Sequence, residues 1–401
     1  MVPTQILSPA AMAYYHDDES PLSHPQRQED VLRRYLGPHE FASFQHPISW
    51  CKVLSCDHRG NQDVDGVLRY LGASTLSQFS NLKKLYTINP NEFLAWCRQA
   101  ARYNVDEWGE YPLHRASRHG SVADVRAILE LYPSAITQPC KQLRNLPLHC
   151  AILSNNEYVV YMLMTAYPEA VHAMNADQGL PLHTAILSCC SDRLVNILFQ
   201  CYPEALVVPN LSHGQTPMHL IYQHRYFRRS HQNIQWWIDR VPRGDNELVE
   251  QAMHHPDVKG RLPAHICMAS DPTSLADLRL LLFYSSSHAL ACTDFEGCTP
   301  LHVACRQGSN PRMLLHAIQA IVRAHPQAAV MFDYEGNMPL HVALRHGAPE
   351  EVVAFLLKFY RPDIYGSRYK LWELAAKHHA SVPSLYLLLR GDPSIASFVQ
   401  S

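Results

Sequence analysis

The chain repeats one short phrase, Pro-Leu-His or a near relative of it, seven times. Its histidines are His114, His149, His183, His219, His265, His302 and His341. Subtracting successive numbers gives steps of 35, 34, 36, 46, 37 and 39 residues. A nearly fixed period of this size, with helical content, indicates a stacked repeat array. Such an array grows by adding units, so 401 residues can form one continuous structure.

Each repeat shows the same order of local signals. A polar turn comes first, commonly Asp-x-x-Gly as in residues 294–297, because a tight hairpin needs a residue that tolerates positive φ. Proline follows at the first position of a short helix, where its missing N–H costs no hydrogen bond. A longer amphipathic helix comes next and ends at a Tyr-Pro or His-Pro step, since proline cannot continue the helical ladder. The pattern predicts an all-α fold of helix-turn-helix units joined by hairpin turns.

The fullest copy of the phrase is Gly-Cys-Thr-Pro-Leu-His-Val-Ala-Cys at residues 297–305, and residues 214–219 carry another. Turn, Thr-Pro-Leu-His-x-Ala helix, glycine and second helix together resemble the ankyrin repeat. The Tyr-Pro-Glu-Ala step at residues 202–205 resembles the repeats of algal and other protist arrays. The resemblance covers about residues 106–390. It implies an ankyrin solenoid of about seven to eight repeats, with a degenerate last unit beginning near residues 370–375.

The remaining stretches suggest four regions. Residues 1–27 are rich in Pro, Ser, His, Gln and acidic residues, and we expect a flexible leader there. Helically spaced apolar residues predict a small helical region at 28–90. The array, with an N-terminal capping helix, is predicted at 91–390, and the 46-residue step between His219 and His265 places an insertion near 224–258. Residues 391–401 form a C-terminal tail.

Two turns depart from the common pattern. In most repeats the small residue of the turn stands three positions before the proline. Asn145 and Gly179 stand only two positions before it. We therefore expect these two hairpins to differ in shape from the others.

Composition excludes some classes of function. The net charge of −2 provides no basic field, so binding to nucleic acid is not expected. No run of about 18 apolar residues is present, and we expect no membrane insertion. The N-terminus has no secretory pattern, and the twelve cysteines are scattered rather than arranged as a disulfide framework. These features favour the cytosol or the nucleus.

The seven repeated histidines could suggest a metal site, but the repeat explains them better. In the ankyrin resemblance this histidine begins the first helix and hydrogen-bonds the backbone of the neighbouring turn. Successive copies would lie roughly 10 Å apart, the usual separation of packed helices. Zinc ligands must lie within about 2 Å of one ion, so neighbouring copies cannot share a metal. We expect a structural role.

A second metal possibility lies before the array. Cys51, Cys56 and His58, with His46 nearby, could form part of a zinc site. Their spacing contains no tight Cys-x-x-Cys pair, and a fourth ligand is not obvious. A packed thiol and loop residues are the favoured interpretation, so we expect no metal and no cofactor.

No catalytic arrangement stands out. The chain lacks the phosphate-binding Gly-x-x-x-x-Gly-Lys-Ser/Thr loop, the Gly-x-Ser-x-Gly elbow and the His-Glu-x-x-His helix. Residues 28–90 show no assembled acid, base and nucleophile. We therefore expect a protein without enzymatic activity.

Candidate partner-binding residues are chosen from three places. Turn aromatics have no packing reason to be there, the ends of the first helices line the inner face by family analogy, and arginine and tryptophan in the insertion are residues that interfaces enrich. The turns supply Trp108, Lys259, Phe295 and Tyr334, the helix ends Arg118, His119, Arg306 and Arg345, and the insertion Arg228, Arg229 and Trp237. For the insertion, a lengthened second helix with buried tryptophans is the alternative, and contact with nucleic acid is a third.

The inner face is expected to change character along the array. The two residues that end each first helix are basic or polar in the outer repeats, as at Arg118 and Arg345. In the middle they are apolar or small, as at Leu153 and Leu187. Such a groove suits an extended or helical segment with acidic ends.

Two functions compete. The first is a non-enzymatic scaffold that binds a protein partner and is itself monomeric. The second uses residues 67–71 and 82–85, which resemble an F-box helix pair, although the Leu-Pro opening and the Cys-Arg/Lys-x-Trp segment of that family are missing. In that case the array would hold substrates for a cullin-type ubiquitin ligase.

Overall fold

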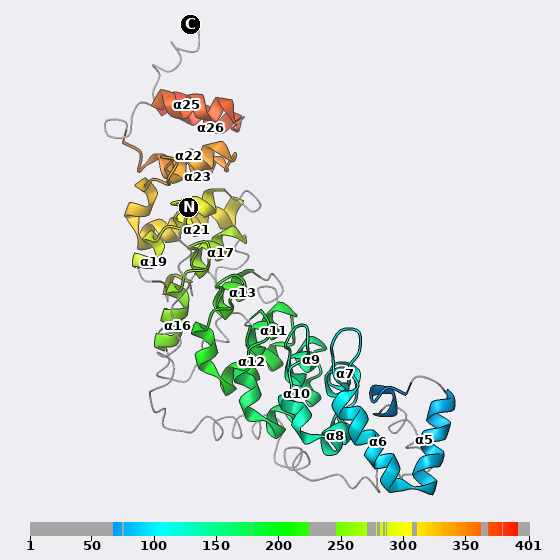
Figure 1. Ribbon diagram of the computed structural model, residues 1–401. Helices are drawn as coiled ribbons and strands as arrows, with labels where there is room; N and C mark the ends of the chain where they lie inside the picture. Colours follow the sequence, from blue (N-terminus) through cyan, green and yellow to red (C-terminus); the bar gives the residue numbers. More distant parts are fainter. Residues whose placement is uncertain are drawn as a thin grey trace, which may run out of the picture.

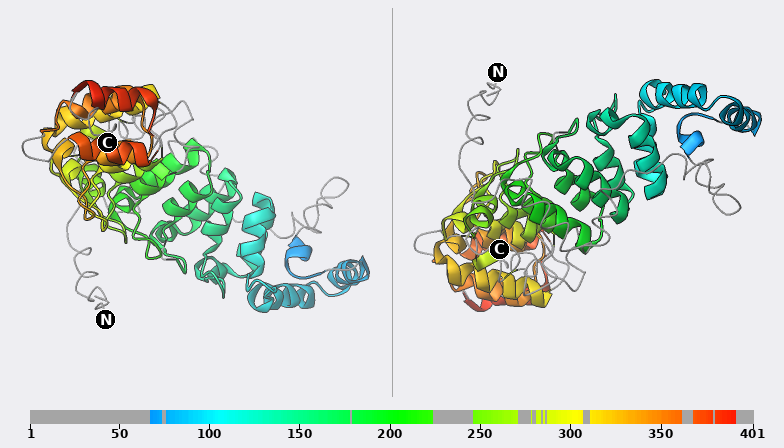
Figure 2. Two further views of the ribbon diagram at one scale, coloured as in Figure 1. Left: turned by 90° about the horizontal axis from the view of Figure 1, so that it is seen from above. Right: turned by 90° about the horizontal axis from the view of Figure 1, so that it is seen from below.

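The computed structural model describes residues 67–73, 76–177, 179–223, 246–270, 278, 281–283, 285, 287–306, 311–361, 368–378 and 380–391. Within these residues every regular element is helical. The helices stack in chain order into a long array (Figure 1). Two turned views show that the array bends, so that the C-terminal repeats overlap one another while the N-terminal half extends to one side (Figure 2). The predicted all-α ankyrin solenoid is confirmed.

The first helices of the repeats are short, and each begins with a proline. Because the first N–H of a helix has no intrahelical acceptor, proline is tolerated there and its fixed φ favours the helical start. Each first helix contacts the next, so together they form one row of the array. They are α7 (Pro112–His119), α9 (Pro147–Leu153), α11 (Pro181–Leu187), α13 (Pro217–Gln223), α17 (Pro263–Ala269), α20 (Pro300–Cys305) and α22 (Pro339–Arg345).

The second helices form the other row. They are α8 (Val122–Leu131), α10 (Glu157–Ala166), α12 (Asp192–Cys201), α21 (Pro311–Ala324) and α23 (Glu350–Leu357). Four end at the predicted Tyr-Pro or His-Pro step. There the chain begins a short 3-10 helix, because an extended residue followed by proline also starts a new helix. The sequence pattern does not predict these 3-10 helices. These are η3 (Pro133–Thr137), η4 (Pro168–His172), η5 (Pro203–Val207) and η6 (Pro326–Val330).

The repeats of His219 and His265 differ from four others just before the next hairpin. Where those four carry a 3-10 helix, the repeat of His219 carries α16 (Asn246–His254) and the repeat of His265 carries α19 (Ser287–Ala291). Helix α16 packs against η5 of the preceding repeat, and α19 packs against η6 of the following one. The array ends with α25 (Arg368–Lys377) and α26 (Val382–Gly391), where the degenerate last unit is predicted.

The N-terminal end consists of a helical turn at residues 67–70, then α5 (Leu76–Ile88) and α6 (Pro90–Tyr103). Val67, Leu68 and Leu71 are buried in the same apolar core as Leu113 of the first repeat. The side-chain amide of Asn104 donates to the carbonyl of Leu71 at 2.6 Å. The part of the predicted 28–90 region that the structure describes therefore shares the core of the array.

Some predicted features lie outside the described residues. These are the leader at 1–27, the zinc alternative of His46, Cys51, Cys56 and His58, most of the tail at 391–401, and insertion residues 224–245 with Arg228, Arg229 and Trp237.

One continuous apolar core runs through the array, from Val67 to Leu388. Each repeat contributes buried side chains to both of its neighbours, so no repeat holds a closed core of its own. Among the helices that the structure describes, none is long and apolar enough to cross a membrane.

In three repeats the histidine joins the first helix to two backbones. In His219, His265 and His302, Nδ1 accepts the N–H of the residue three positions earlier, at 3.2, 3.0 and 3.1 Å. The ring proton is then on Nε2, which donates to a carbonyl of the next hairpin at 2.9, 3.0 and 3.0 Å. The structural role predicted for this histidine is confirmed.

These imidazoles are kept neutral by burial. Desolvation lowers the pKa of His114, His149, His183 and His219 to about 4. At neutral pH each ring therefore carries a single proton, as the two-bond arrangement requires.

Hairpin length does not follow the position of the small residue. The turn at 140–145 is one residue longer than the turn at 175–179, as the backbone bonds Cys140 N–H to Asn145 C=O (2.9 Å) and Asn175 N–H to Gly179 C=O (3.2 Å) show. The longer form recurs at 210–215, although its glycine stands at the usual place. The expectation that the Asn145 and Gly179 hairpins differ from the others is wrong for their length, because the first has the length of the turn at 210–215 and the second that of the turn at 106–110. In the turn at 140–145, Arg144, with φ of 51°, lies where other turns place glycine.

Candidate protein-binding surface

The hairpin tips are joined into a ladder along one edge of the array. At five steps a backbone N–H of one tip donates to a carbonyl of the preceding tip. The bonds are Lys141 to Gly109 (3.0 Å), Ala176 to Leu143 (2.7 Å), Val258 to His213 (3.0 Å), Phe295 to Lys259 (3.0 Å) and Tyr334 to Glu296 (3.2 Å). This tip ladder holds neighbouring turns in a fixed register.

The aromatic tip residues have a packing role, contrary to the expectation from sequence. The ring of Phe295 lies against Gly260, where an added Cβ would stand 2.7 Å from Cδ1 of the ring. Tyr334 lies in the same way against Gly297, with Cδ1 2.6 Å from an added Cβ. Because real Cβ contacts are longer, only glycine fits under each ring. The rings hold neighbouring tips together as well as facing outward.

These rings nevertheless remain open to solvent. Trp108 is 65 % exposed, Phe295 72 % and Tyr334 76 %. Lys259, on a tip that lies between those of Trp108 and Phe295 along the array, is also exposed. Fixed, exposed aromatic rings of this kind are typical anchors of protein interfaces.

The ends of the first helices form a second row, one residue from each repeat at the sixth position after the proline. Leu153 and Leu187, in the middle of the row, are 42 % and 49 % exposed. The apolar centre predicted for the inner face is therefore present. The full row is Arg118, Leu153, Leu187, Gln223, Ala269, Arg306 and Arg345.

The arginines in this row are already paired within the chain. Arg118 donates to Glu110 at 2.5 Å, Arg306 to Glu296 at 3.0 Å, and Arg345 to Glu335 at 3.0 Å. Each helix end faces the turn of its own repeat, so arginine and turn glutamate meet. The hydrogen bond from Arg345 is the main cause of the lowered pKa of Glu335. The basic residues predicted at the ends of the inner face are therefore present, but each of these three arginines is paired with a glutamate.

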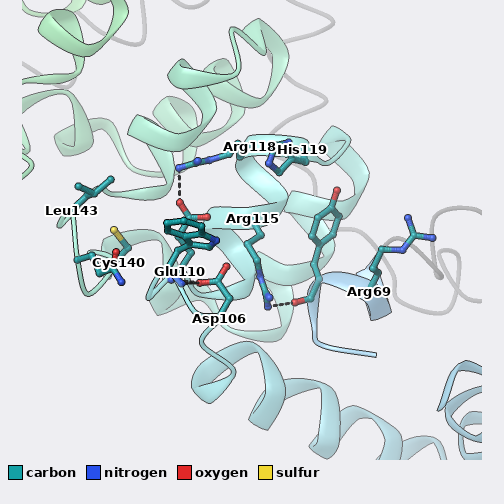
Figure 3. Close-up of a pocket in the computed structure, with 11 residues that line it drawn as sticks. Arg69, Asp106, Glu110, Arg115, Arg118, His119, Cys140 and Leu143 are labelled. Atoms are coloured by element: carbon teal, nitrogen blue, oxygen red, sulfur yellow. Dashed lines mark hydrogen bonds and ion pairs between the residues drawn. The ribbon is translucent and has the colours of Figure 1, made fainter. Parts of the chain in front are cut away.

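Two clefts open along this surface. The first, which we name the N-terminal cleft, has a volume of about 520 Å³ and is lined by Arg69, Tyr70, Asp106, Trp108, Glu110, Arg115, Arg118, His119, Cys140, Gln142 and Leu143 (Figure 3). Three of the partner-binding residues predicted from the sequence line this cleft, namely Trp108, Arg118 and His119. The second cleft, of about 400 Å³, lies at the centre of the array and includes Lys259, with Asn175, Asn210, Gln215 and Gln223. Phe295, Arg306, Tyr334 and Arg345 line neither cleft.

Sequence reasoning missed Arg69, Tyr70 and Arg115 of the N-terminal cleft. Arg69 and Tyr70 belong to a stretch that the sequence assigns to a separate region, so nothing places them beside the first repeat. Arg115 did carry a signal, because the equivalent position in other repeats is Cys150, Thr184, Leu220, Ile266, Val303 or Val342. A charged residue at an apolar repeat position indicates a different neighbour.

One group of side chains has ligands that metals use. Atoms of Asp294, Glu296 and Cys298 all lie within 4.8 Å of one another. The guanidinium of Arg306 already binds two of them, Glu296 at 3.0 Å and the sulfur of Cys298 at 3.1 Å. Asp294 accepts the backbone N–H groups of residues 296 and 298. Burial raises the pKa of Cys298 to about 11, so its thiol is protonated at neutral pH, and the group functions as a turn cap.

Comparison with known proteins agrees with the repeat pattern. The family model for ankyrin repeats, in three copies, matches residues 240–366. No curated protein matches the chain.

Solved structures of similar shape include two ankyrin repeat domains. The ankyrin repeat domain of Bcl-3, a member of the IkappaB family, has 21 % identity and a TM-score of 0.47, over 63 % of this chain and 100 % of that one. The human ASB11 domain has 18 % identity and a TM-score of 0.43, over 63 % and 99 %. A chain from the complex of the endopeptidase Bd0816 with immunity protein Bd3460 of Bdellovibrio bacteriovorus has 13 % identity and a TM-score of 0.40, over 55 % and 99 %.

Proposed function

The chain is an ankyrin-repeat protein, and from this we propose that it binds a protein partner, without catalysis, through the tip ladder and the inner ends of its first helices. The observation that carries the proposal is the row of exposed apolar and aromatic side chains on successive tips. Besides the candidates already named, it includes Leu143, Leu211 and Val258, which are 51 %, 54 % and 54 % exposed. Large apolar side chains gathered on one edge mark interaction sites.

The tips are suited to binding because their conformation is fixed before a partner arrives. Backbone bonds between tips and the rings packed on Gly260 and Gly297 remove much of their freedom. Less conformational entropy is then lost on association, which favours affinity. The arginine–glutamate pairs at the helix ends would contribute mainly to specificity, since a partner must complement or exchange them.

The same geometry is poorly suited to catalysis. A repeat surface touches only neighbouring repeats and builds an open face rather than a closed site. Enzymes commonly exclude water around the reacting groups, which an open face does not do. We therefore retain a scaffold or adaptor, acting as a monomer in the cytosol or nucleus, as the proposed role.

The F-box-like alternative stays a hypothesis without further support. Val67, Leu68 and Leu71, which would belong to its helix pair, are buried in the core of the array. A ligase linker protein that binds the full chain, but not a chain that lacks residues 1–90, would restore this alternative.

The proposal is tested by affinity purification with the full chain as bait. We expect a specific partner whose recovery falls about tenfold in the double variant Phe295→Ala/Tyr334→Ala, as for residues at the centre of an interface. Tyr158→Ala is the matched control, because this tyrosine is 59 % exposed on the second-helix row, away from the tips. A partner lost equally from the control, or retained by every tip and inner-face variant, would argue against the proposed surface.

A further inference from the structure

The N-terminal cleft is built from four separate pieces of the chain. The 106–110 tip supplies Trp108, the 140–145 tip supplies Leu143, and α7 supplies Arg115 and Arg118. The turn at residues 67–73, which we name the capping turn, supplies Arg69. In Figure 3, Arg69 and Leu143 lie at opposite ends of the cleft, with Glu110 and Arg115 between them. The cleft thus combines cations with apolar surface.

Both carboxylates of the cleft are already used. Asp106 accepts the backbone N–H groups of Trp108 and Glu110 at 3.0 and 2.8 Å, which closes the turn. Glu110 accepts Arg118. Their two negative charges stand against the three positive charges of Arg69, Arg115 and Arg118, so the lining carries one net positive charge.

Two of the three guanidinium groups, those of Arg69 and Arg115, keep donors that no carboxylate accepts. Arg115 donates through Nη2 to the carbonyl of Tyr70 at 2.6 Å, a neutral acceptor, and its buried Nε has no hydrogen-bond partner among the described residues. Arg69 is exposed, and neither arginine forms an ion pair with a described acidic residue. A planar guanidinium with free donors binds carboxylates and phosphates in a bidentate geometry, and in an unmodified protein segment the matching group is a carboxylate. The cleft therefore favours an anionic ligand.

The opposite wall favours an apolar group. Trp108 is 65 % exposed and Leu143 51 % exposed, so both present apolar area to whatever enters. Tryptophan and arginine are the residues that most often dominate binding energy at interfaces. A ligand that satisfies both walls needs a carboxylate and a large apolar side chain close together.

The central cleft differs from the N-terminal cleft in charge balance. Of its two cations, Arg261 already binds Asp257 at 2.7 Å, and Asp177 lines the same cleft as Lys259. At the C-terminal end, Arg306 and Arg345 are each paired with a glutamate of their own turn. Charge complementarity thus distinguishes the N-terminal cleft from the other parts of the inner face that the structure describes.

We propose that the N-terminal cleft is the docking site for a linear segment of the partner protein in which acidic residues flank a large apolar residue. The carboxylates meet Arg69 and Arg115, and the apolar side chain packs between Trp108 and Leu143. This inference rests on the proposed function and gives it a partner chemistry. It also limits the expected acidic contact to one end of the array.

The test is a selection of random 12-residue peptides by phage display on the full chain. We expect selected peptides enriched in Asp or Glu next to Leu, Phe or Trp. A dye-labelled copy should bind about tenfold more weakly when its acids are replaced by their amides, and about tenfold more weakly to Arg69→Glu/Trp108→Ala. Arg115 is left unchanged because it holds the capping turn. The control is Lys358→Glu/Tyr158→Ala, two exposed positions on the second-helix row and away from the cleft, which should bind within about twofold of the unchanged chain.

Three results would overturn the inference. They are selected peptides without acidic enrichment, binding that the cleft variant leaves unchanged, and no peptide above background. Thermal melts of both variants confirm that the folded chain is compared. If the partner is still captured through Phe295 and Tyr334, the proposed function survives the loss of the cleft. If no partner is captured either, both proposals fail.

Discussion

In four repeats a single histidine links the first helix to the hairpin that follows it. His302, for example, accepts the N–H of Thr299 and donates to the carbonyl of Asn337. Only a neutral ring can do both, because a protonated imidazole has no acceptor. The stability of the array is therefore coupled to the protonation of these rings.

This coupling predicts acid destabilisation. Four of the repeated histidines have a folded pKa of about 4, below the value of about 6.5 in an unfolded chain. The unfolded chain then binds more protons than the folded one as the pH falls, so the stability present above pH 6.5 is lost between about 6.5 and 4. We expect the urea midpoint, followed by circular dichroism, to fall steadily from pH 7 to pH 4.5.

A variant separates the histidines from other acid effects. His183→Gln should cost about 1–3 kcal/mol at pH 7.5, since a buried donor or acceptor loses its partner. It should also reduce the pH slope by up to about 1.4 kcal/mol per pH unit, because one titrating group is gone. An unchanged slope would show that His183 does not contribute to the acid effect.

Two glycines of the tip ladder allow a matched comparison. Gly297 and Gly336 have similar φ values of 76° and 79°, so alanine meets the same backbone strain at both. An added Cβ would stand 2.6 Å from the backbone nitrogen of Tyr334 at Gly297, whereas at Gly336 nothing lies within 4 Å. We expect Gly336→Ala to cost about 1–2 kcal/mol and Gly297→Ala to cost about 1–3 kcal/mol more, as for overpacking.

Urea unfolding of the two variants measures the difference. Equal destabilisation would mean that the ring of Tyr334 moves away without cost, and the packing of tip on tip would then add little to the ladder.

At the scale of helices, much of the fold follows from the pattern. Proline marks the start of each first helix, and a Tyr-Pro or His-Pro step marks the end of four second helices. Both signals follow from local backbone chemistry. The 3-10 helices, α16 and α19 could not be predicted from the repeated pattern. They fill equivalent positions in their repeats, but their sequences differ from one another. The partners of Arg118, Arg306 and Arg345 were also out of reach, since pairing with a turn glutamate depends on how each helix end meets its turn.

The capping turn at residues 67–73 is held by few polar contacts. Asn104 reaches the carbonyl of Leu71, and Arg115 reaches that of Tyr70. We expect Asn104→Ala to loosen this turn, because a half-buried carbonyl loses its donor, at a cost of about 1–2 kcal/mol. Hydrogen exchange should rise at residues 68–73 and stay unchanged in α10 and α12. Unchanged exchange at 68–73 would show that apolar burial alone holds the cap.

For the whole molecule, the period of the repeated phrase predicts the architecture but not its bend. The curvature seen in Figure 2 is the sum of small rotations between neighbouring repeats, and no single residue encodes it. The N-terminal cleft is equally a product of assembly, because Arg69 and Arg115 are 46 residues apart in the chain and line the same cleft only through stacking.

The continuous core makes stability a property of neighbours rather than of the whole chain. Leu148 of α9 is 1 % exposed and packs within the core that α7, α9 and α11 share. Leu148→Ala should cost about 2–5 kcal/mol, the usual loss for a buried leucine. In an array with nearest-neighbour coupling this loss is felt most in adjacent repeats. Hydrogen exchange should therefore rise in α7 to α12 while α22 to α26 keep their protection, whereas an equal rise along the chain would show that the array unfolds as one cooperative unit.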